Sequence, residues 1–274
     1  MSNAENSLLK KQKSYKEGLL LVQQCGFCLI PEIKTTEYFQ NMYGDLPHTL
    51  NVPGVPANFT VLQDLVPIAE QGGHLLVMPN AHYISLATVE DQEGIAVARD
   101  AIIGGLRKHF PNNSIFTFEH GQGFLDGEPV ACGGCHLDHA HGHLIILPEG
   151  SQLAPIQNKV EEVLLTNGWM DPNFHAVRSG KIFIDITQRS GTNPYLHIGM
   201  VMPDGASSSL TYVQKTKSLN VPSQLLRASI SEVIYKQTDP TYWHWRDVQM
   251  GLASSQRMEQ MKRDVVAFRQ ITGF

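Results

Sequence analysis

The segment CGGCHLDHAHGHLIILPEG, residues 132–150, constrains the fold more than any other part of the chain. His139, His141 and His143 alternate with Ala140 and Gly142, and the apolar run LIIL follows directly. On an extended strand, residues two apart share a face, so the three imidazoles would point to one side. A short apolar run that ends at proline and glycine predicts a buried strand. The pattern therefore predicts a core strand that begins at a cluster of histidines.

Histidines in this arrangement suit phosphoryl chemistry. An imidazole can attack phosphorus at neutral pH and leave again, provided that a hydrogen bond to its far nitrogen sets the correct tautomer. Flanking imidazoles and backbone N–H groups would stabilise charge on the phosphoryl oxygens, and Gly142 would let a phosphate approach the backbone closely. The same spacing also suits a metal site or a surface patch of histidines, so these alternatives stay open.

Composition excludes several classes of protein. The chain has 274 residues and 42% hydrophobic content, which allows one large domain or two modest ones. With 21 basic and 26 acidic residues the net charge is -5, so we expect no binding to duplex nucleic acid or to an anionic membrane surface. No apolar run approaches the length of a membrane span, and the N-terminal residues lack the apolar centre of a secretion signal. These features favour a cytoplasmic protein.

Periodicity divides the chain into an α+β first half, residues 1–150, and a smaller α+β region, residues 151–274. In the first half we expect a helix over residues 6–24, a strand pair in NFTVLQDLVP and GHLLVMP, and strands in SIFTFEH and GHLIILP. TVEDQEGIAVARDAIIGGLRKHF predicts a helix capped by Thr88. In the second half we expect a helix over residues 155–167, strands in KIFIDIT, YLHIGMVM and SLTYVQ, and helices in PSQLLRASISEVIY and SSQRMEQMKRDVVAFRQI.

The motif HAHGHLI resembles the signature of the histidine-triad superfamily. The segment VLQDLVPIAEQGGHLLVMPNAHYISL is similar to the nucleoside-pocket hairpin of that superfamily. CGFCLI is similar to the Cys pair of its zinc-bearing members, and FEHG is similar to the Phe-Glu-Asn strand end of its uridylyl-transferring members. The resemblance covers residues 25–148 in the correct order. It implies a nucleotide-binding catalytic domain with an antiparallel sheet flanked by helices.

The resemblance also implies roles for individual residues. His141 would be the nucleophile that forms a nucleotidyl-histidine intermediate, and His143 would contact the transferring phosphate or assist the leaving group. His139 completes the implied catalytic set. The other implied nucleotide-binding residues are Asp64 at the ribose with Leu65 next to it, Glu119 and His120 at phosphate or sugar, and Gly142 beside the phosphate. The alternative for Asp64 is a turn residue before Pro67.

The implied activity is hydrolysis of a nucleoside phosphate, a phosphoramidate or a dinucleoside polyphosphate. Uridylyl-transferring relatives carry Gln where this chain carries His143, which favours the hydrolase. The alternatives are a nucleotidyltransferase or phosphorylase of the same superfamily, and a non-catalytic module that binds nucleotide or RNA.

Two sets of zinc ligands compete. Local spacing alone favours all four cysteines, or Cys132 and Cys135 with His136, because Cys-x-x-Cys followed by His is compact. The resemblance instead implies a structural zinc on a set that includes the first histidine of the triad. That set is Cys25, Cys28, His82 and His139. CGGC would then be either a flexible loop beside the active site or a second metal or redox site.

The last hundred or so residues resemble, more weakly, a C-terminal extension of splicing-associated and RNA-debranching-related relatives. Trp243, Trp245 and Arg246 could form a base-stacking patch, although core packing explains these aromatic residues better. His197 could reach the active site from its strand or could be a packed residue. The second half could also cover a face that smaller relatives bury by dimerisation, so a monomer and a homodimer both stay open.

Overall fold

The computed structural model describes residues 44, 46, 49–64, 66–130, 139–168, 177–179, 193–214, 224–244, 247–248 and 252–274. The helix expected over residues 6–24, both Cys-x-x-Cys pairs and the strand expected in KIFIDIT lie outside these residues. Among the described helices, none combines the length and the apolar character that crossing a membrane would require.

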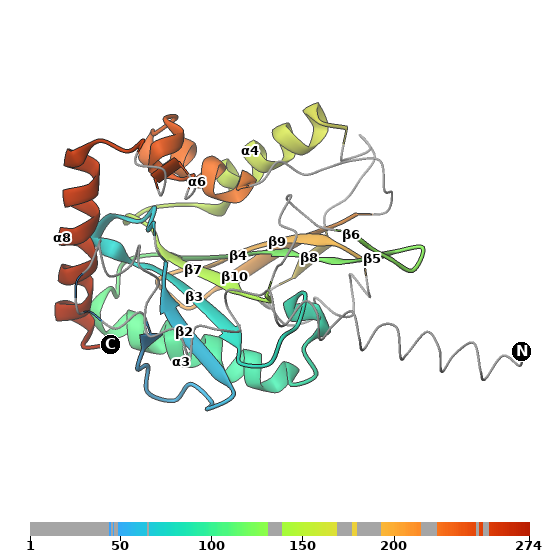
Figure 1. Ribbon diagram of the computed structural model, residues 1–274, viewed down its shortest axis with the longest axis horizontal. Coiled ribbons are helices and arrows are strands. Elements are labelled where there is room, and N and C mark those ends of the chain that lie inside the picture. The colour runs from blue at the N-terminus through green and yellow to red at the C-terminus, as the bar shows by residue number, and fades with distance from the viewer. Residues whose placement is uncertain are drawn as a thin grey trace, which may run out of the picture.

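Eight strands of the described part form one sheet in the order β1-β2-β3-β7-β4-β9-β10-β8 (Figure 1). All neighbouring pairs are antiparallel, which confirms the predicted α+β class with an antiparallel sheet. The strands are β1 Thr49–Leu50, β2 Phe59–Gln63, β3 His74–Pro79, β4 Ile115–Gly121, β7 Gly142–Ile146, β8 Val177–Ser179, β9 Tyr195–Val201 and β10 Ser207–Val213. A separate hairpin joins β5 Gly123–Leu125 to β6 Glu128–Val130.

The predicted β2–β3 hairpin is present, with Phe59 opposite Pro79 and Gln63 opposite Leu75. Strand β7 lies between β3 and β4, so the histidine motif enters the middle of the sheet. The boundary expected at residue 150 falls between β7 and α4 (Leu153–Thr166). Strands β9 and β10, from the later half of the chain, extend the same sheet through the pairing of β9 with β4.

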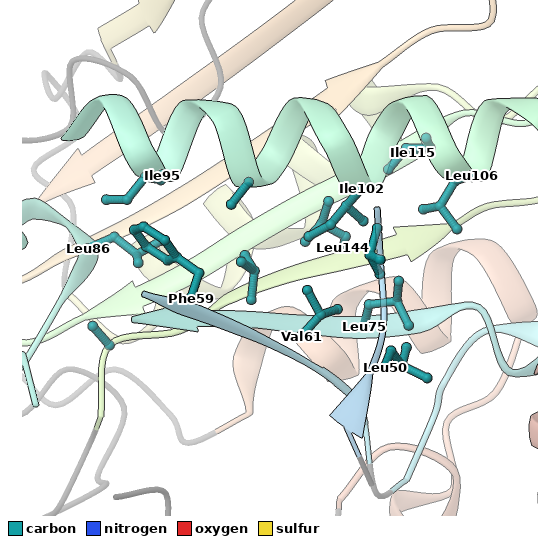
Figure 2. Close-up of a cluster of buried hydrophobic side chains, with 14 of the residues drawn as sticks. Leu50, Phe59, Val61, Leu75, Leu86, Ile95, Ile102, Leu106, Ile115 and Leu144 are labelled. Carbon is teal, nitrogen blue, oxygen red and sulfur yellow. The ribbon is translucent and has the colours of Figure 1, made fainter. Parts of the chain in front are cut away.

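Helix α3 (Gln92–His109) covers one face of the sheet (Figure 1). Figure 2 shows Ile95, Ile102 and Leu106 pointing from this helix toward the apolar side chains of the strands, as their helical spacing predicts. The expected cap at Thr88 is wrong. Asp91 caps the helix by accepting a 2.8 Å hydrogen bond from the backbone N–H of Gly94, because the chain first makes a separate 3-10 turn, η2 (Leu86–Thr88).

Helices α4 and α6 (Leu225–Tyr235) pack on the opposite face (Figure 1). Their core includes Phe116 and Phe118 of β4 and Ile145 of β7, whereas Ile115 and Leu144 belong to the α3 side. Side chains alternate along a strand, so His143 shares the α6 side with Ile145. The face of the sheet on which a side chain lies therefore decides whether it can contact His143.

The C-terminal helix α8 (Ser255–Thr272) closes one end of the sheet, where it packs against the 3-10 turn η1 (Glu70–Gly72). Gly72 has a φ of +70°, and a Cβ at this position would lie 2.7 Å from the backbone oxygen of Asp264. Glycine is therefore required here for both its backbone angle and its size. A further 3-10 turn, η3 (Pro240–Tyr242), connects α6 to this end of the chain.

Candidate active site

His141 lies in the segment that leads into β7, where one backbone hydrogen bond and one contact between a side chain and the backbone are formed. The N–H of Ala140 donates to the carbonyl of Tyr83 at 2.7 Å. The His141 Nδ1 lies 2.6 Å from the carbonyl oxygen of His139. A carbonyl can only accept, so Nδ1 carries the proton and the neutral ring has its lone pair on Nε2. His141 is part-exposed, and in this tautomer Nε2 is the nitrogen with the lone pair that a nucleophile needs.

His143 is the next histidine on the same face. Its ring stacks on Phe118 with centroids 4.0 Å apart and planes 9° apart, and the centroid of His141 lies 4.9 Å away. In the sheet, His143 sits opposite Leu76 of β3 and Phe118 of β4. The structure thus brings His141 and His143 together, as the alternating spacing predicts.

A buried polar cluster lies behind His143. Its Nδ1 is 2.9 Å from Nε2 of His74, and the Oδ2 of Asp64 is 3.6 Å from the His74 nitrogen and 3.9 Å from the His143 nitrogen. Asp64 Oδ1 accepts a 2.8 Å hydrogen bond from the N–H of Val66. Asp64 Oδ2 also accepts from Nη1 of Arg227 at 2.7 Å, so α6 contributes directly to the cluster.

Arg227 makes three different contacts with its guanidinium group. Besides Asp64, its Nη2 donates to the carbonyl of Val66 and its Nε donates to the carbonyl of Trp243 at 2.8 Å. The side chains of Asp64 and Arg227 are 8% and 5% exposed. Both oxygens of Asp64 are therefore engaged inside the protein, and a ribose would have to share them. The ribose-binding role of Asp64 stays a prediction.

Burial and charge set the protonation of this cluster. Burial raises the pKa of Asp64, but the charges of Arg227 and His74 outweigh it, so the carboxyl pKa is lowered. Burial lowers the pKa of His74 to about 3 and that of His143 well below its ordinary value. The cluster therefore consists of a carboxylate, a guanidinium and two neutral imidazoles.

Asp64, His74 and His143 offer ligand atoms that all lie within 4.8 Å of one another, a grouping that could hold a metal ion. Two features favour a hydrogen-bonded cluster instead. The guanidinium of Arg227 already neutralises Asp64, and the His74–His143 distance of 2.9 Å is that of a direct hydrogen bond. A metal ion here would lie close to an arginine charge.

His139 and His82, two of the four ligands implied for zinc, lie together with ring centroids 5.3 Å apart. The Nε2 of His139 is 2.6 Å from the carbonyl of Pro79 and must donate to it, which leaves Nδ1 as the unprotonated nitrogen. A metal-binding histidine commonly donates its other N–H to a backbone carbonyl in this way. Cys25 and Cys28, and the rival ligands Cys132, Cys135 and His136, lie outside the described residues.

The contact expected between Glu119 and phosphate or sugar stays a prediction, and both carboxylate oxygens are already hydrogen-bonded inside the protein. Strand alternation directs Glu119 to the α3 side, where it is 1% exposed. Its Oε1 accepts from the N–H of Leu86 at 2.7 Å, and its Oε2 accepts from the hydroxyl of Tyr195 at 2.5 Å. Glu119 thus anchors the turn that follows His82.

The next residue, His120, is on the active-site side. It is half-buried, and burial followed by the charge of His141 lowers its pKa to about 3. Gly142 is buried at the start of β7, opposite Val77. Leu65 lies outside the described residues.

The residues of the C-terminal half that the sequence analysis named do not lie beside His141 and His143 where the structure describes them. His197 is the packed residue of the two alternatives, since it is 1% exposed and its Nδ1 lies 3.0 Å from the hydroxyl of Thr211. It lies opposite Glu119, so it shares the α3 side. Trp243 packs against the core beneath α6, and Trp245 and Arg246 lie outside the described residues.

Sequence reasoning did not single out two members of the cluster. His74 could have been noticed as the polar residue of an otherwise apolar strand, HLLVMP. Arg227 interrupts the apolar face of α6 and had no recognisable partner nearby in the sequence, because Asp64 is 163 residues away.

The sequence matches no family model and no curated protein. The structure is similar to a GalT-like protein from Arabidopsis thaliana, with 14% identity, a TM-score of 0.37 and coverage of 67% of this chain and 82% of that chain. It is also similar to an ADP-glucose phosphorylase from the same plant (12%, TM-score 0.35, coverage 74% and 81%). A yeast Ap4A phosphorylase is similar as well (9%, TM-score 0.38, coverage 89% and 81%).

Proposed function

We propose that this protein is an enzyme that transfers a nucleotidyl group through a covalent intermediate on His141, with water as the acceptor. The observation that carries the proposal is the 2.6 Å contact from His141 Nδ1 to the carbonyl of His139. It sets the one tautomer in which Nε2 can attack phosphorus. A protein that only binds nucleotide does not need this arrangement.

In the first step, the Nε2 lone pair of His141 forms a bond to the α-phosphorus while the bond from phosphorus to the leaving group breaks. His143 and His120, on the same side of the sheet, are the nearby imidazoles that would contact the phosphoryl oxygens or the leaving group. In the second step, water attacks the phosphorus, the N–P bond breaks, and a nucleoside monophosphate is released. The proposed substrates are nucleoside phosphates, phosphoramidates and dinucleoside polyphosphates.

A structural zinc belongs to the same proposal. His82 and His139 lie together, and His139 presents an unprotonated Nδ1, so the described half of the ligand set fits the ion. Cys25 and Cys28 would complete a four-ligand site. A closed site of this kind supplies no metal-bound water, and its effect would be to hold the segment that carries His141.

The test compares the full chain with His141→Ala, using α-labelled nucleotides that include an adenosine phosphoramidate and diadenosine tetraphosphate. We expect turnover and an acid-labile adduct in the intact mass of the wild type, and the loss of both in the variant. His109→Ala is the control, because His109 is an exposed histidine at the end of α3. Full turnover by His141→Ala would overturn the covalent mechanism.

The acceptor is tested in the same reaction. Adding inorganic phosphate or a sugar phosphate leaves the product of a hydrolase unchanged, whereas a phosphorylase or transferase would form a new nucleotide product. Nucleotide binding without adduct or turnover would indicate the non-catalytic module.

A further inference from the structure

The strongest feature outside the proposed nucleophile is the link from α6 to His143. Arg227 reaches Asp64, Asp64 lies beside both buried histidines, and His74 is hydrogen-bonded to His143. This chain of contacts joins the C-terminal half of the protein to an active-site imidazole. The inference below rests on the proposed function.

The His74–His143 bond can hold its proton in two ways. Either His74 Nε2–H donates to His143 Nδ1, or His143 Nδ1–H donates to His74 Nε2. Each neutral ring carries one proton. One of the two protons lies in the His74–His143 bond, and the direction of that bond determines which nitrogen outside it carries the other. In the first arrangement it is Nε2 of His143, and in the second it is Nδ1 of His74.

Two observations favour the first arrangement. Within the described part of the chain, Nδ1 of His74 has no hydrogen-bond partner, and a buried N–H without a partner is rarer than a buried acceptor without one. In addition, the carboxylate of Asp64 lies nearer to the His74 nitrogen, at 3.6 Å, than to the His143 nitrogen, at 3.9 Å. The negative charge therefore attracts the shared proton to His74.

We infer that Arg227 and Asp64 are positioning residues that hold the proton of the His74–His143 pair on His74, so that His143 presents an Nε2–H to the substrate. His143 is then the donor to the phosphoryl oxygens or the leaving group, and His141 is the nucleophile. When the leaving group departs, the electron pair of the broken bond stays on it, the hydrogen bond from His143 Nε2–H stabilises the charge, and a leaving nitrogen takes its proton from solvent. In the second step the attacking water releases a proton to solvent, and His141 Nε2 recovers its lone pair as the N–P bond breaks.

Arg227 acts by restricting Asp64. Its contacts with the carbonyls of Val66 and Trp243 fix the guanidinium, and the Val66 N–H fixes the other oxygen of Asp64. Without Arg227, Asp64 could turn away from His74, and its negative charge would be unbalanced in a buried site. The C-terminal half would thus complete the active site without touching the substrate.

The test uses Arg227→Met, Asp64→Asn and the double variant. Arg269→Met is the matched control, because Arg269 is a buried arginine on α8 that donates at 2.8 Å to Gln63, the residue next to Asp64. We expect kcat to fall about tenfold or more in both single variants with little change in KM. We expect the double variant to lose less than the product of the two single losses, because the residues act as one unit. The control should keep its kcat.

A second readout does not depend on turnover. The nitrogen-15 shifts of the histidine side chains in the free protein report the tautomer of each ring, and His143→Gln assigns the His143 signals. We expect a protonated Nε2 on His143 in the wild type and a mixture of tautomers in Arg227→Met, with no change in Arg269→Met. A wild-type His143 protonated on Nδ1 would overturn the inference, even if the enzyme is active. The expected tautomers without any turnover would instead contradict the proposed function.

Arg227→Met could fail to fold. Arg227→Lys then takes its place, because it keeps the charge but cannot make all three contacts. We expect Arg227→Lys to have a lower kcat and an unchanged melting temperature. Full activity of this variant would count against the inference.

Discussion

Arg227 and Asp64 are 163 residues apart in the chain and form a buried ion pair with 2.7 Å between Nη1 and Oδ2. The pair joins α6 to the end of the β2 strand, beside His74 and His143. It gives the C-terminal part of the chain a structural role and, by our inference, a role in positioning His143.

The pair should matter for stability. Removing one partner leaves a buried charge without compensation, so Arg227→Met should lower the free energy of unfolding by about 3 kcal/mol. The double variant Arg227→Met with Asp64→Asn should be less destabilised than the sum of the single variants, because it leaves no unpaired charge. Urea unfolding followed by circular dichroism measures the free energy of unfolding of both single variants and of the double variant. If the loss in the double variant equalled the sum of the two single losses, Arg227 and Asp64 would not be coupled.

Stability should fall as the pH drops below the ordinary histidine pKa of 6.5. His74 is fully buried, and its pKa is lowered to about 3. Between these values the unfolded chain binds a proton that the folded protein does not, so each pH unit removes up to roughly 1.4 kcal/mol from the free energy of unfolding for this histidine. Urea unfolding between about pH 7 and about pH 5 measures the slope. His74→Gln should reduce it, and an unchanged slope would show that another group is responsible.

Gly121→Ala should be strongly destabilising. A Cβ at this position would lie 2.2 Å from the ring of Tyr195, which must stay in place to donate to Glu119. We expect a loss of about 2 kcal/mol or more in the free energy of unfolding, because the ring cannot move without losing the hydrogen bond from its hydroxyl to the buried carboxylate of Glu119. Gly104→Ala is the control, since nothing lies within 4 Å of its Cβ position. Equal melting temperatures for the two variants would contradict the prediction.

The zinc proposal predicts about one equivalent of metal per chain by elemental analysis. Cys25→Ser and His82→Asn should each reduce the zinc content and the melting temperature. Cys132→Ser should do neither if the rival ligand set is wrong. Zinc lost from Cys132→Ser but retained in Cys25→Ser would instead place the ion on the local Cys-x-x-Cys-His set.

Local patterns in the sequence predicted much of the fold. The β2–β3 hairpin, the strand after the histidine motif, α3 and the helices near the C-terminus all follow from periodicity and from glycine and proline at their ends. The error at Thr88, in contrast, has a long-range cause. Thr88 and Asp91 are both good caps, and the 3-10 turn that decided between them depends on Glu119, a residue of another strand.

The alternation of His139, His141 and His143 by itself determined that imidazoles would gather at the start of a core strand, because neighbouring residues of a strand face opposite sides. Only the tertiary structure decided which other groups meet them. It placed Glu119 on the far side of the sheet, turned His139 toward His82, and brought His74, Asp64 and Arg227 behind His143. Those contacts depend on the pairing of distant strands and on the packing of α6. The sequence around each residue therefore does not predict which residue it contacts.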